Sequence, residues 1–190
     1  MEAIENEMDP LQGLQKISEV ISKTKENIRE QSFCFLLWGW LIAIASFSFF
    51  ILHSYTSFSL YFLPFPILAI SGIIATIYYY NGKRYASETY LGYYLRILWL
   101  VLGLGFILIV FINVVEKYPP FTYTILISGM GTLVSGLVLR FRPLIIGGII
   151  FLLFSVASIF VTDSMKPLLQ GIAVIAGYLI PGYLLKYSKS

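Results

Sequence analysis

The sequence predicts an all-α protein: a polytopic membrane bundle of six transmembrane helices, built as antiparallel hairpins, with an amphipathic helix before the first span. Three observations lead to this fold class. Apolar residues make up 58% of the 190 residues and charged residues only 12%, whereas soluble domains hold about 25% charged residues. The apolar residues gather in six uncharged runs, each long enough to cross a bilayer. Lys and Arg fall almost entirely in alternate gaps between these runs.

The chain divides into a cytoplasmic segment at residues 1–32 and a transmembrane domain at residues 33–190. Each predicted span has 19 to 21 residues, which gives about 30 Å of helix and matches the thickness of the hydrocarbon core. Helices are required because lipid offers no partner to backbone N–H and C=O groups. The predicted spans are 33–52, 60–80, 97–115, 121–139, 143–161 and 167–185.

Prolines mark the beginnings of several predicted spans. A proline in the first turn of a helix loses no hydrogen bond, and its fixed φ suits the helical backbone. The prolines at or near span starts are Pro64, Pro66, Pro119, Pro120, Pro143 and Pro167. Pro181 lies inside the last span, where we expect a kink or a loosened turn. Asn81-Gly82 predicts a helix stop after the second span.

The basic residues predict the orientation, because short loops rich in Lys and Arg stay in the cytoplasm. One side of the predicted bundle holds eleven bases and the other side holds two, Lys117 and Lys166. The eleven are Lys16, Lys23, Lys25, Arg29, Lys83, Arg84, Arg96, Arg140, Arg142, Lys186 and Lys189. We therefore expect a multi-pass protein of the cytoplasmic (inner) membrane, with both termini cytoplasmic. The bilayer is the expected partner, and nucleic acid is not, since the bases form no dense run.

Aromatic residues crowd the predicted cytoplasmic boundary. They include Trp38, Trp40, Tyr78, Tyr79, Tyr80, Tyr90, Tyr93, Tyr94 and Trp99. This distribution is typical of an interfacial belt. A stacking platform for a ligand is the alternative interpretation.

The fourth span has the pattern of a closely packed helix. Its small residues are Ser128, Gly129, Gly131, Thr132, Ser135 and Gly136. Small residues four apart let two backbones approach, so we expect this span to lie centrally. Other close-packing positions are expected at Gly103, Gly105, Gly147, Gly148, Ala173 and Gly177. The alternative makes Ser128-Gly129-x-Gly131 an unwound ion site, but no carboxylate or proline adjoins it.

The spans also suggest three hairpins in series. Each even-numbered span follows a proline, at Pro64, Pro120 and Pro167, and the Ser-Gly pairs ending at Gly72 and Gly129 come eight and nine residues after the first two. Because Pro and Gly are common in membrane helices, a true repeat and a chance likeness both stay open.

Ionisable residues at membrane depth are functional candidates, because each costs about 2.5–3.5 kcal/mol at the bilayer centre. None lies at a predicted span midpoint. His53, Glu116 and Asp163 fall at the outer ends of three spans, and together they could bind a metal or relay protons. The alternative is three solvated rim residues, with Lys117 and Lys166 beside the acids.

The sequence contains no catalytic, metal or cofactor motif that rises above background. A single histidine excludes an H-E-x-x-H zinc motif and bis-histidine haem ligation within one chain. We therefore expect no enzyme and no cofactor. Asn113 and Gln170 are the most polar uncharged residues at membrane depth, where we expect hydrogen bonds between helices.

The segment before the first span predicts an amphipathic helix from Pro10 to about Gln31. Asp9-Pro10 is typical of a helix start. A narrow stripe follows on an otherwise charged helix. It consists of Leu14, Ile17, Ile21 and Ile28, with Leu11 before it and Thr24 filling the gap. The stripe could lie on the membrane surface, pair with a second copy or another chain as a coiled coil, or enter a groove of a cytoplasmic partner. Protein contact is the favoured interpretation.

The junction with the first span, Ser32-Phe33-Cys34-Phe35-Leu36-Leu37-Trp38-Gly39-Trp40-Leu41 after an amphipathic segment, resembles a family of uncharacterised small six-helix bacterial inner-membrane proteins. The resemblance covers roughly residues 14–46 and the general six-span layout. It implies a cytoplasmic membrane location and no established activity, so it transfers no functional residues.

The sequence therefore favours a non-enzymatic integral membrane protein, an accessory or regulatory subunit that contacts a cytoplasmic or membrane protein through residues 10–31. The alternative is a small transporter or channel for a neutral or apolar solute, since no midplane charge supports ion coupling.

Overall fold

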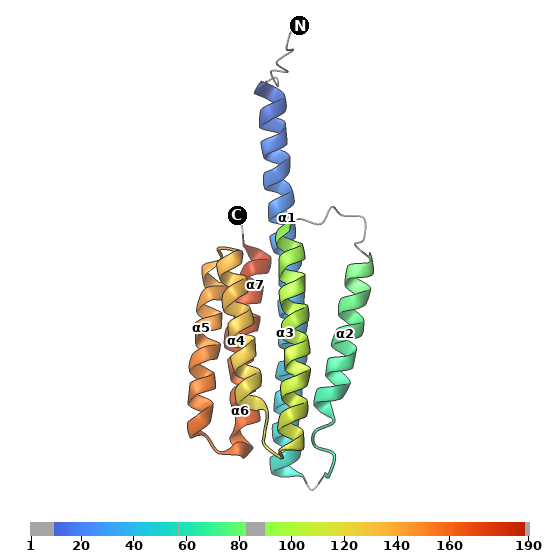
Figure 1. Ribbon diagram of the computed structural model, residues 1–190, viewed down its shortest axis with the longest axis vertical. Helices are drawn as coiled ribbons and strands as arrows, with labels where there is room; N and C mark the ends of the chain where they lie inside the picture. Colours follow the sequence, from blue (N-terminus) through green and yellow to red (C-terminus); the bar gives the residue numbers. More distant parts are fainter. Residues whose placement is uncertain (1–9, 57, 83–89, 189–190) are drawn as a thin grey trace.

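The computed structural model describes residues 10–56, 58–82 and 90–188, and the side chains of 32–56, 58–81 and 91–188. Within these ranges the protein is an all-helical, up-and-down bundle without strands (Figure 1). The elements are α1 (Pro10–Tyr55), α2 (Pro64–Gly82), α3 (Tyr90–Val115), α4 (Phe121–Val138), α5 (Arg142–Ala157), the 3-10 turns η1 (Ser158–Phe160) and η2 (Asp163–Met165), α6 (Lys166–Val174), the π-helix η3 (Ile175–Leu179) and α7 (Ile180–Tyr187).

Five segments are long and apolar enough to cross a membrane. They are Ser32–Tyr55, Leu91–Val115, Phe121–Val138, Arg142–Phe160 and Asp163–Tyr187. They correspond to the predicted first, third, fourth, fifth and sixth spans. The third begins six residues earlier than predicted, because the helix continues through the tyrosines and Arg96 that precede the apolar run.

The second predicted span, 60–80, is not among these five. Residues 60–63 form a turn, and α2 begins only at Pro64. Proline lacks an N–H group, but a residue in the first turn of a helix has no partner within the helix for that group, so nothing is lost. Three tyrosines and Asn81 occupy its last turns, so its apolar part is shorter than the predicted run. As expected from Asn81-Gly82, the helix ends at Gly82.

Neighbouring helices pack in antiparallel pairs. In the view of Figure 1, α2 lies on one side of α1, and α4 to α7 lie on the other side. The most extensive packing is between α4 and α5, while α1 packs against α2 on one face and against α6, η3 and α7 on another. The core between them includes Phe35, Ile125, Leu144, Phe151 and Tyr178.

Two glycines bring α4 and α5 into backbone contact. A Cβ built at Gly136 would lie 2.6 Å from the Ile145 backbone nitrogen. A Cβ built at Gly148 would lie 2.6 Å from the Leu133 Cα. Since neither backbone can yield easily, only hydrogen fits at these two positions. This is the close approach that small residues permit in lipid.

The predictions for the other close-packing positions are confirmed in α5 and the sixth span and wrong in α3. Gly147, Gly148, Ala173 and Gly177 are buried in the bundle, so their predictions are confirmed. Those for Gly103 and Gly105 are wrong: no described atom lies within 4 Å of a Cβ built at either position. The reason is that α3 is the least covered of the five membrane-length segments.

The sixth span is interrupted by the π-helix η3, which ends two residues before Pro181. Proline has no N–H to donate to the Gly177 carbonyl four residues earlier, so the regular bonding pattern fails there. The Ile180 N–H bonds instead to the Ile175 carbonyl. The loosened turn predicted at Pro181 is therefore present, as a π-turn on its N-terminal side.

Two helices end in a left-handed residue that is not glycine. Lys117 after α3 has φ 61° and Arg140 after α4 has φ 51°. In each case a bond closes over the turn, from Tyr118 N to Asn113 O at 2.9 Å and from Phe141 N to the carbonyl of Gly136 at 2.9 Å. Both ends are Schellman motifs, in which glycine is the usual occupant.

Candidate functional site

The most distinctive feature of the molecule is the N-terminal part of α1. One helix runs without a break from Pro10 to Tyr55, so the predicted boundary at residue 32 falls inside a continuous helix. Figure 1 shows that its first part projects beyond the ends of the other helices. From Pro10 to Gln31 this part is about 33 Å long at about 1.5 Å per residue.

The apolar stripe continues the face of α1 that packs into the bundle. Counted at about 100° per residue, positions 14, 17, 21 and 28 lie within about 60° of one another. The buried positions of α1 at the start of the membrane segment are Ser32, Phe35, Gly39, Ala43 and Ser46, which lie within about 80° of one another, and Ala45, which lies apart from them. The mean directions of the two sets differ by only about 10°. By the helical backbone alone, the stripe positions continue the buried face of α1; their side chains lie outside the described part of the chain.

The lower part of α1 is held firmly on that face. A Cβ built at Gly39 would lie 2.8 Å from the Leu179 Cδ2, so α1 and the sixth span approach closely. The Trp40 Nε1 donates to the Tyr183 hydroxyl at 3.1 Å. Phe35 packs edge-to-face on Trp99 at a centroid distance of 5.7 Å. These contacts fix the orientation of α1 relative to the bundle.

A second set of contacts holds α1 against α2. The Phe33 and Tyr79 rings stack at 3.8 Å, and the Cys34 sulfur lies 3.3 Å from the Tyr80 hydroxyl. The Trp38 Nε1 donates to Thr76 Oγ1 at 3.2 Å. Both sides of α1 are therefore packed just below the point where it leaves the bundle.

The three rim residues predicted from sequence are exposed, and His53 and Asp163 have different partners. His53 packs against the Tyr61 ring at 4.8 Å. Asp163 pairs with Lys166 at 2.6 Å, and Glu116 is exposed at the end of α3, next to Lys117. In the described part of the chain, no group of three or more His, Cys, Asp or Glu residues could hold a metal ion.

The six small residues of α4 are all buried. The Ser128 and Thr132 side chains form hydrogen bonds with the Tyr178 side chain of the sixth span, and Thr132 Oγ1 donates to the Ser128 carbonyl at 2.7 Å. Gly129 faces α5, where its Cβ would meet Leu152 at 3.0 Å. The backbone remains helical throughout, so the residues form a packing face, with no unwound segment. The sixth span is buried to a slightly greater extent than the fourth.

The two uncharged polar residues differ in their bonding. Gln170 on α6 is buried, and Thr124 Oγ1 on α4 lies 3.0 Å from its Oε1. This contact confirms the expected bond between helices. Asn113 donates at 2.8 Å to the Ile109 carbonyl of its own helix, so it does not join two helices as expected.

Sequence reasoning missed the roles of Trp38 and Trp99. Neither is simply part of an interfacial belt, because each ring covers a glycine of the following helix. A Cβ at Gly72 would lie 3.2 Å from the Trp38 ring, and a Cβ at Gly131 would lie 2.9 Å from the Trp99 ring. The signal in the sequence was a glycine four residues before Thr76 or Ser135, a spacing that places both on one helix face.

Comparison with known proteins adds no relative: no family model, no curated protein and no solved structure matches this chain. The fold and the site together define the class as an all-helical bundle with five membrane-length segments and one projecting helix. The resemblance of the segment around Trp38 to a family of small bacterial inner-membrane proteins stays a prediction.

Proposed function

We propose that this protein is a six-span protein of the cytoplasmic membrane and a non-enzymatic accessory or regulatory subunit, which presents the stripe of α1 to a partner. The five membrane-length segments account for five crossings, and we assign the remaining crossing to α2. In Figure 1 it runs back alongside α1 over most of the bundle height, and both the N-terminal end of α1 and the C-terminal end of α7 lie at the same end. An even number of crossings gives that arrangement.

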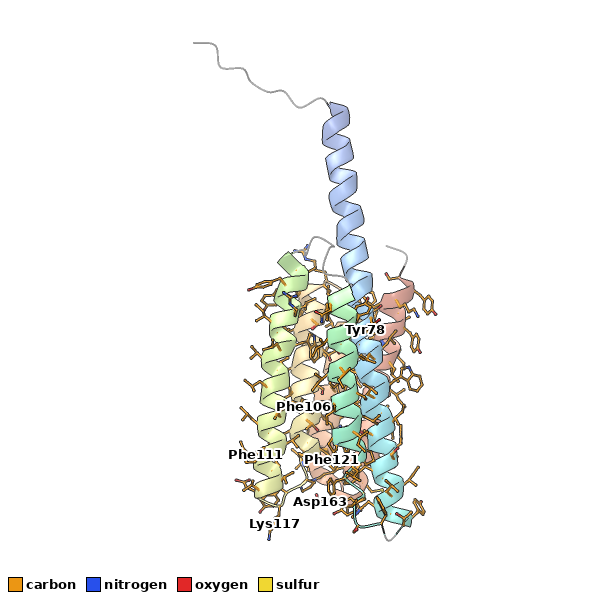
Figure 2. All side chains as sticks on the ribbon, turned by 90° about the vertical axis from the view of Figure 1, so that its right-hand side faces the viewer. Tyr78, Phe106, Phe111, Lys117, Phe121 and Asp163 are labelled. Atoms are coloured by element: carbon orange, nitrogen blue, oxygen red, sulfur yellow. The ribbon has the colours of Figure 1, made fainter. Side chains whose placement is uncertain are left out.

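The described charges support an orientation with this end in the cytoplasm. Arg96, Arg140, Arg142 and Lys186 belong to helix ends on the side from which α1 projects. The only acids among the described side chains are Glu116 and Asp163, which belong to the opposite end. Figure 2 shows Lys117 and Asp163 there. Bases on one side and few on the other follow the rule for short cytoplasmic loops.

One observation supports the proposed function: α1 is a single continuous helix from Pro10 to Tyr55, and its first part projects beyond the ends of the other helices (Figure 1). A helix that lay flat on the membrane surface would have to bend near Ser32, where the structure has no break. An apolar stripe on a projecting helix is the arrangement by which amphipathic helices engage protein grooves. Leu14, Ile17, Ile21 and Ile28 are the proposed contact residues.

The experiment replaces two stripe residues and compares a matched control. Ile17→Lys with Ile21→Lys should abolish co-purification of partners and reduce the size of the complex on native gels in mild detergent. Gln15→Lys with Ser22→Lys adds the same charge at about 110–130° from the mean direction of the stripe and should change neither. Unchanged partners and unchanged complex size for both variants would end this proposal.

A further inference from the structure

One buried hydroxyl group inside the bundle has no hydrogen-bond partner. The Ser46 side chain on α1 is 0% exposed, and among the buried side-chain nitrogens and oxygens of the described residues only its Oγ lacks a partner. Other buried hydroxyls bond back to their own helix, as Thr132 Oγ1 does to the Ser128 carbonyl and Ser158 Oγ to the Ser155 carbonyl. A buried hydroxyl without a partner costs free energy, so a further polar group is expected at this oxygen.

Ser46 faces the sixth span. At about 100° per residue, it lies within about 20° of Gly39 around the axis of α1. A Cβ built at Gly39 would come within 2.8 Å of a side chain of the sixth span. The neighbouring residue Phe47 sets the level, because a Cβ built at Gly171 would lie 3.0 Å from its ring. Gln170 adjoins Gly171 and is therefore at about the same level as Ser46.

The first turn of α4 reaches this level too. The Phe49 and Phe121 rings meet edge-to-face at 5.3 Å, and α1 and α4 run in opposite directions (Figure 1). Three residues further into the bundle from this contact lie Ser46 on α1 and Thr124 on α4. Thr124 is buried and bonded to Gln170. Three helices thus bring three buried polar side chains to one level.

A small neutral molecule can join these groups. Thr124 Oγ1 donates to Gln170 Oε1 at 3.0 Å, so the amide nitrogen with its two protons is on the other side of the carboxamide. The Ser46 hydroxyl can donate one hydrogen bond and accept two. Neither group is charged, which favours a neutral ligand over an ion. The close approach at Gly171 allows only a small one.

We propose that a water molecule is bound inside the bundle between Ser46 and Gln170. It accepts a proton from the Gln170 amide and bonds to the Ser46 hydroxyl. Buried waters typically make about three hydrogen bonds to polar groups that otherwise lack a partner. This water connects α1 with α6 and, through Thr124, with α4. The site is independent of the proposed function, since it lies within the bundle and not on the projecting part of α1.

Thermal melting in mild detergent provides the first test. Ser46→Ala should lower the melting temperature by about 2–4 °C, because the bound water loses one of its partners. The loss for Ser46→Ala combined with Gln170→Leu should be smaller than the sum of the two single losses, since both variants release the same water. Ser48→Ala is the matched control and should change the melting temperature little. Ser48 is only half-buried and points about 160° away from Ser46 around the helix.

The second test detects the water itself. X-ray radiolysis of the full-length protein in nanodiscs generates hydroxyl radicals from water, and radicals formed from a bound water oxidise the side chains beside it. Phe121, one turn from Thr124, is the reporter, and Phe35 is the control with the same exposure of 5%. Mass spectrometry should show severalfold faster oxidation of Phe121 than of Phe35. Ser46→Ala and Gln170→Leu should each remove most of that difference.

Two results overturn the proposal. An unchanged or raised melting temperature for Ser46→Ala would mean that its hydroxyl has no partner to lose. Oxidation of Phe121 that is the same in the parent and in both variants would mean that the radicals come from water outside the bundle. A loss of stability with unchanged oxidation counts against the water as well, because Ser46 then bonds directly to a group of the chain.

Discussion

The Trp99 indole nitrogen donates a hydrogen bond to the Ser135 hydroxyl oxygen at 3.1 Å, and the same ring covers Gly131 one turn away. The contact fixes the register of α3 against α4, because Gly131 has no side chain and leaves room for the Trp99 ring, and the Ser135 hydroxyl accepts a hydrogen bond from the ring nitrogen. A slide by one turn would lose both interactions.

The first hairpin repeats this contact with the same spacing. Trp38 covers Gly72 and donates to Thr76, four residues further on. Leu41 and Leu102, each three residues after its tryptophan, approach the same two glycines at 2.7 Å from a built Cβ. Two hairpins therefore share one contact unit, in which Gly72 corresponds to Gly131. The spacing of the Ser-Gly pairs in the sequence suggests instead that Gly72 corresponds to Gly129, but Gly129 faces α5.

The third hairpin keeps only part of the unit. The Phe151 ring lies directly against Gly177, but the residue four positions later is Pro181, which has no hydroxyl. The π-helix occurs at this point. Loss of the hydroxyl partner and loss of the regular helix thus coincide in the sixth span.

A double-mutant cycle tests the register contact. Trp99→Phe and Ser135→Ala should each lower the free energy of unfolding, and their coupling energy should be about 0.6 kcal/mol, the average for hydrogen bonds between membrane helices. The measurement is unfolding in mild detergent for the parent, both single variants and the double variant. Strict additivity would show that the bond contributes nothing to stability.

Alanine substitutions should distinguish glycines that contact the backbone of another helix from glycines with no neighbour near their Cα. Gly136→Ala and Gly148→Ala should each lower stability by about 2–3 kcal/mol, since the new methyl meets the backbone of the facing helix. Gly103→Ala is the control, because a Cβ there meets no described atom within 4 Å; it should leave stability unchanged or raise it by about 0.5 kcal/mol. Thermal melting in detergent ranks the three. Equal losses would contradict the packing.

Glycine at position 117 should stabilise the protein. Lys117 has φ 61°, and a side chain in this region costs about 1 kcal/mol. Lys117→Gly should therefore raise the melting temperature, whereas Glu116→Gly, at the neighbouring position without positive φ, should lower it. The opposite order in paired thermal melts would show that the left-handed end is not the strained site.

The Gln170–Thr124 pair should show mutual dependence. Thr124→Val leaves the buried Gln170 amide without its partner and should cost about 1–2 kcal/mol. Gln170→Leu should cost a similar amount by the reverse argument. The double variant should recover part of the loss, because no buried polar group is then left unpaired. Losses that add in the double variant, as measured by unfolding in detergent, would rule out this coupling.

Hydropathy predicted most of the helices, since five of six runs match segments long enough to cross a membrane. It overestimated the second, because a run such as 60–80 shows apolar length and not where Pro64 permits a helix to start. Glycine spacing predicted the buried face of α4, yet it failed at Gly103 and Gly105. A small residue shows that close approach is possible, and only the arrangement of the helices decides which neighbour comes near.

The projecting helix was predictable in extent but not in direction. The stripe and Pro10 follow from the sequence. The structure shows that residues 10–31 and the segment from Ser32 onward form one continuous helix. No residue near Ser32 indicates from the sequence whether the helix continues or breaks there. The tryptophan contacts were hidden for a similar reason, because Trp38 and Trp99 have the composition and depth of an interfacial belt and their partners lie on the next helix.

The most direct test of the six-span account is the side of the membrane on which the segment between α2 and α3 lies. Green fluorescent protein or alkaline phosphatase inserted after Tyr85 of the full-length chain reports that side. If α2 crosses and the N-terminal helix is cytoplasmic, the first reporter fluoresces and the second is inactive. An active phosphatase at this position would mean that α2 does not complete the crossing or that the whole chain is inverted, and either result would contradict the account.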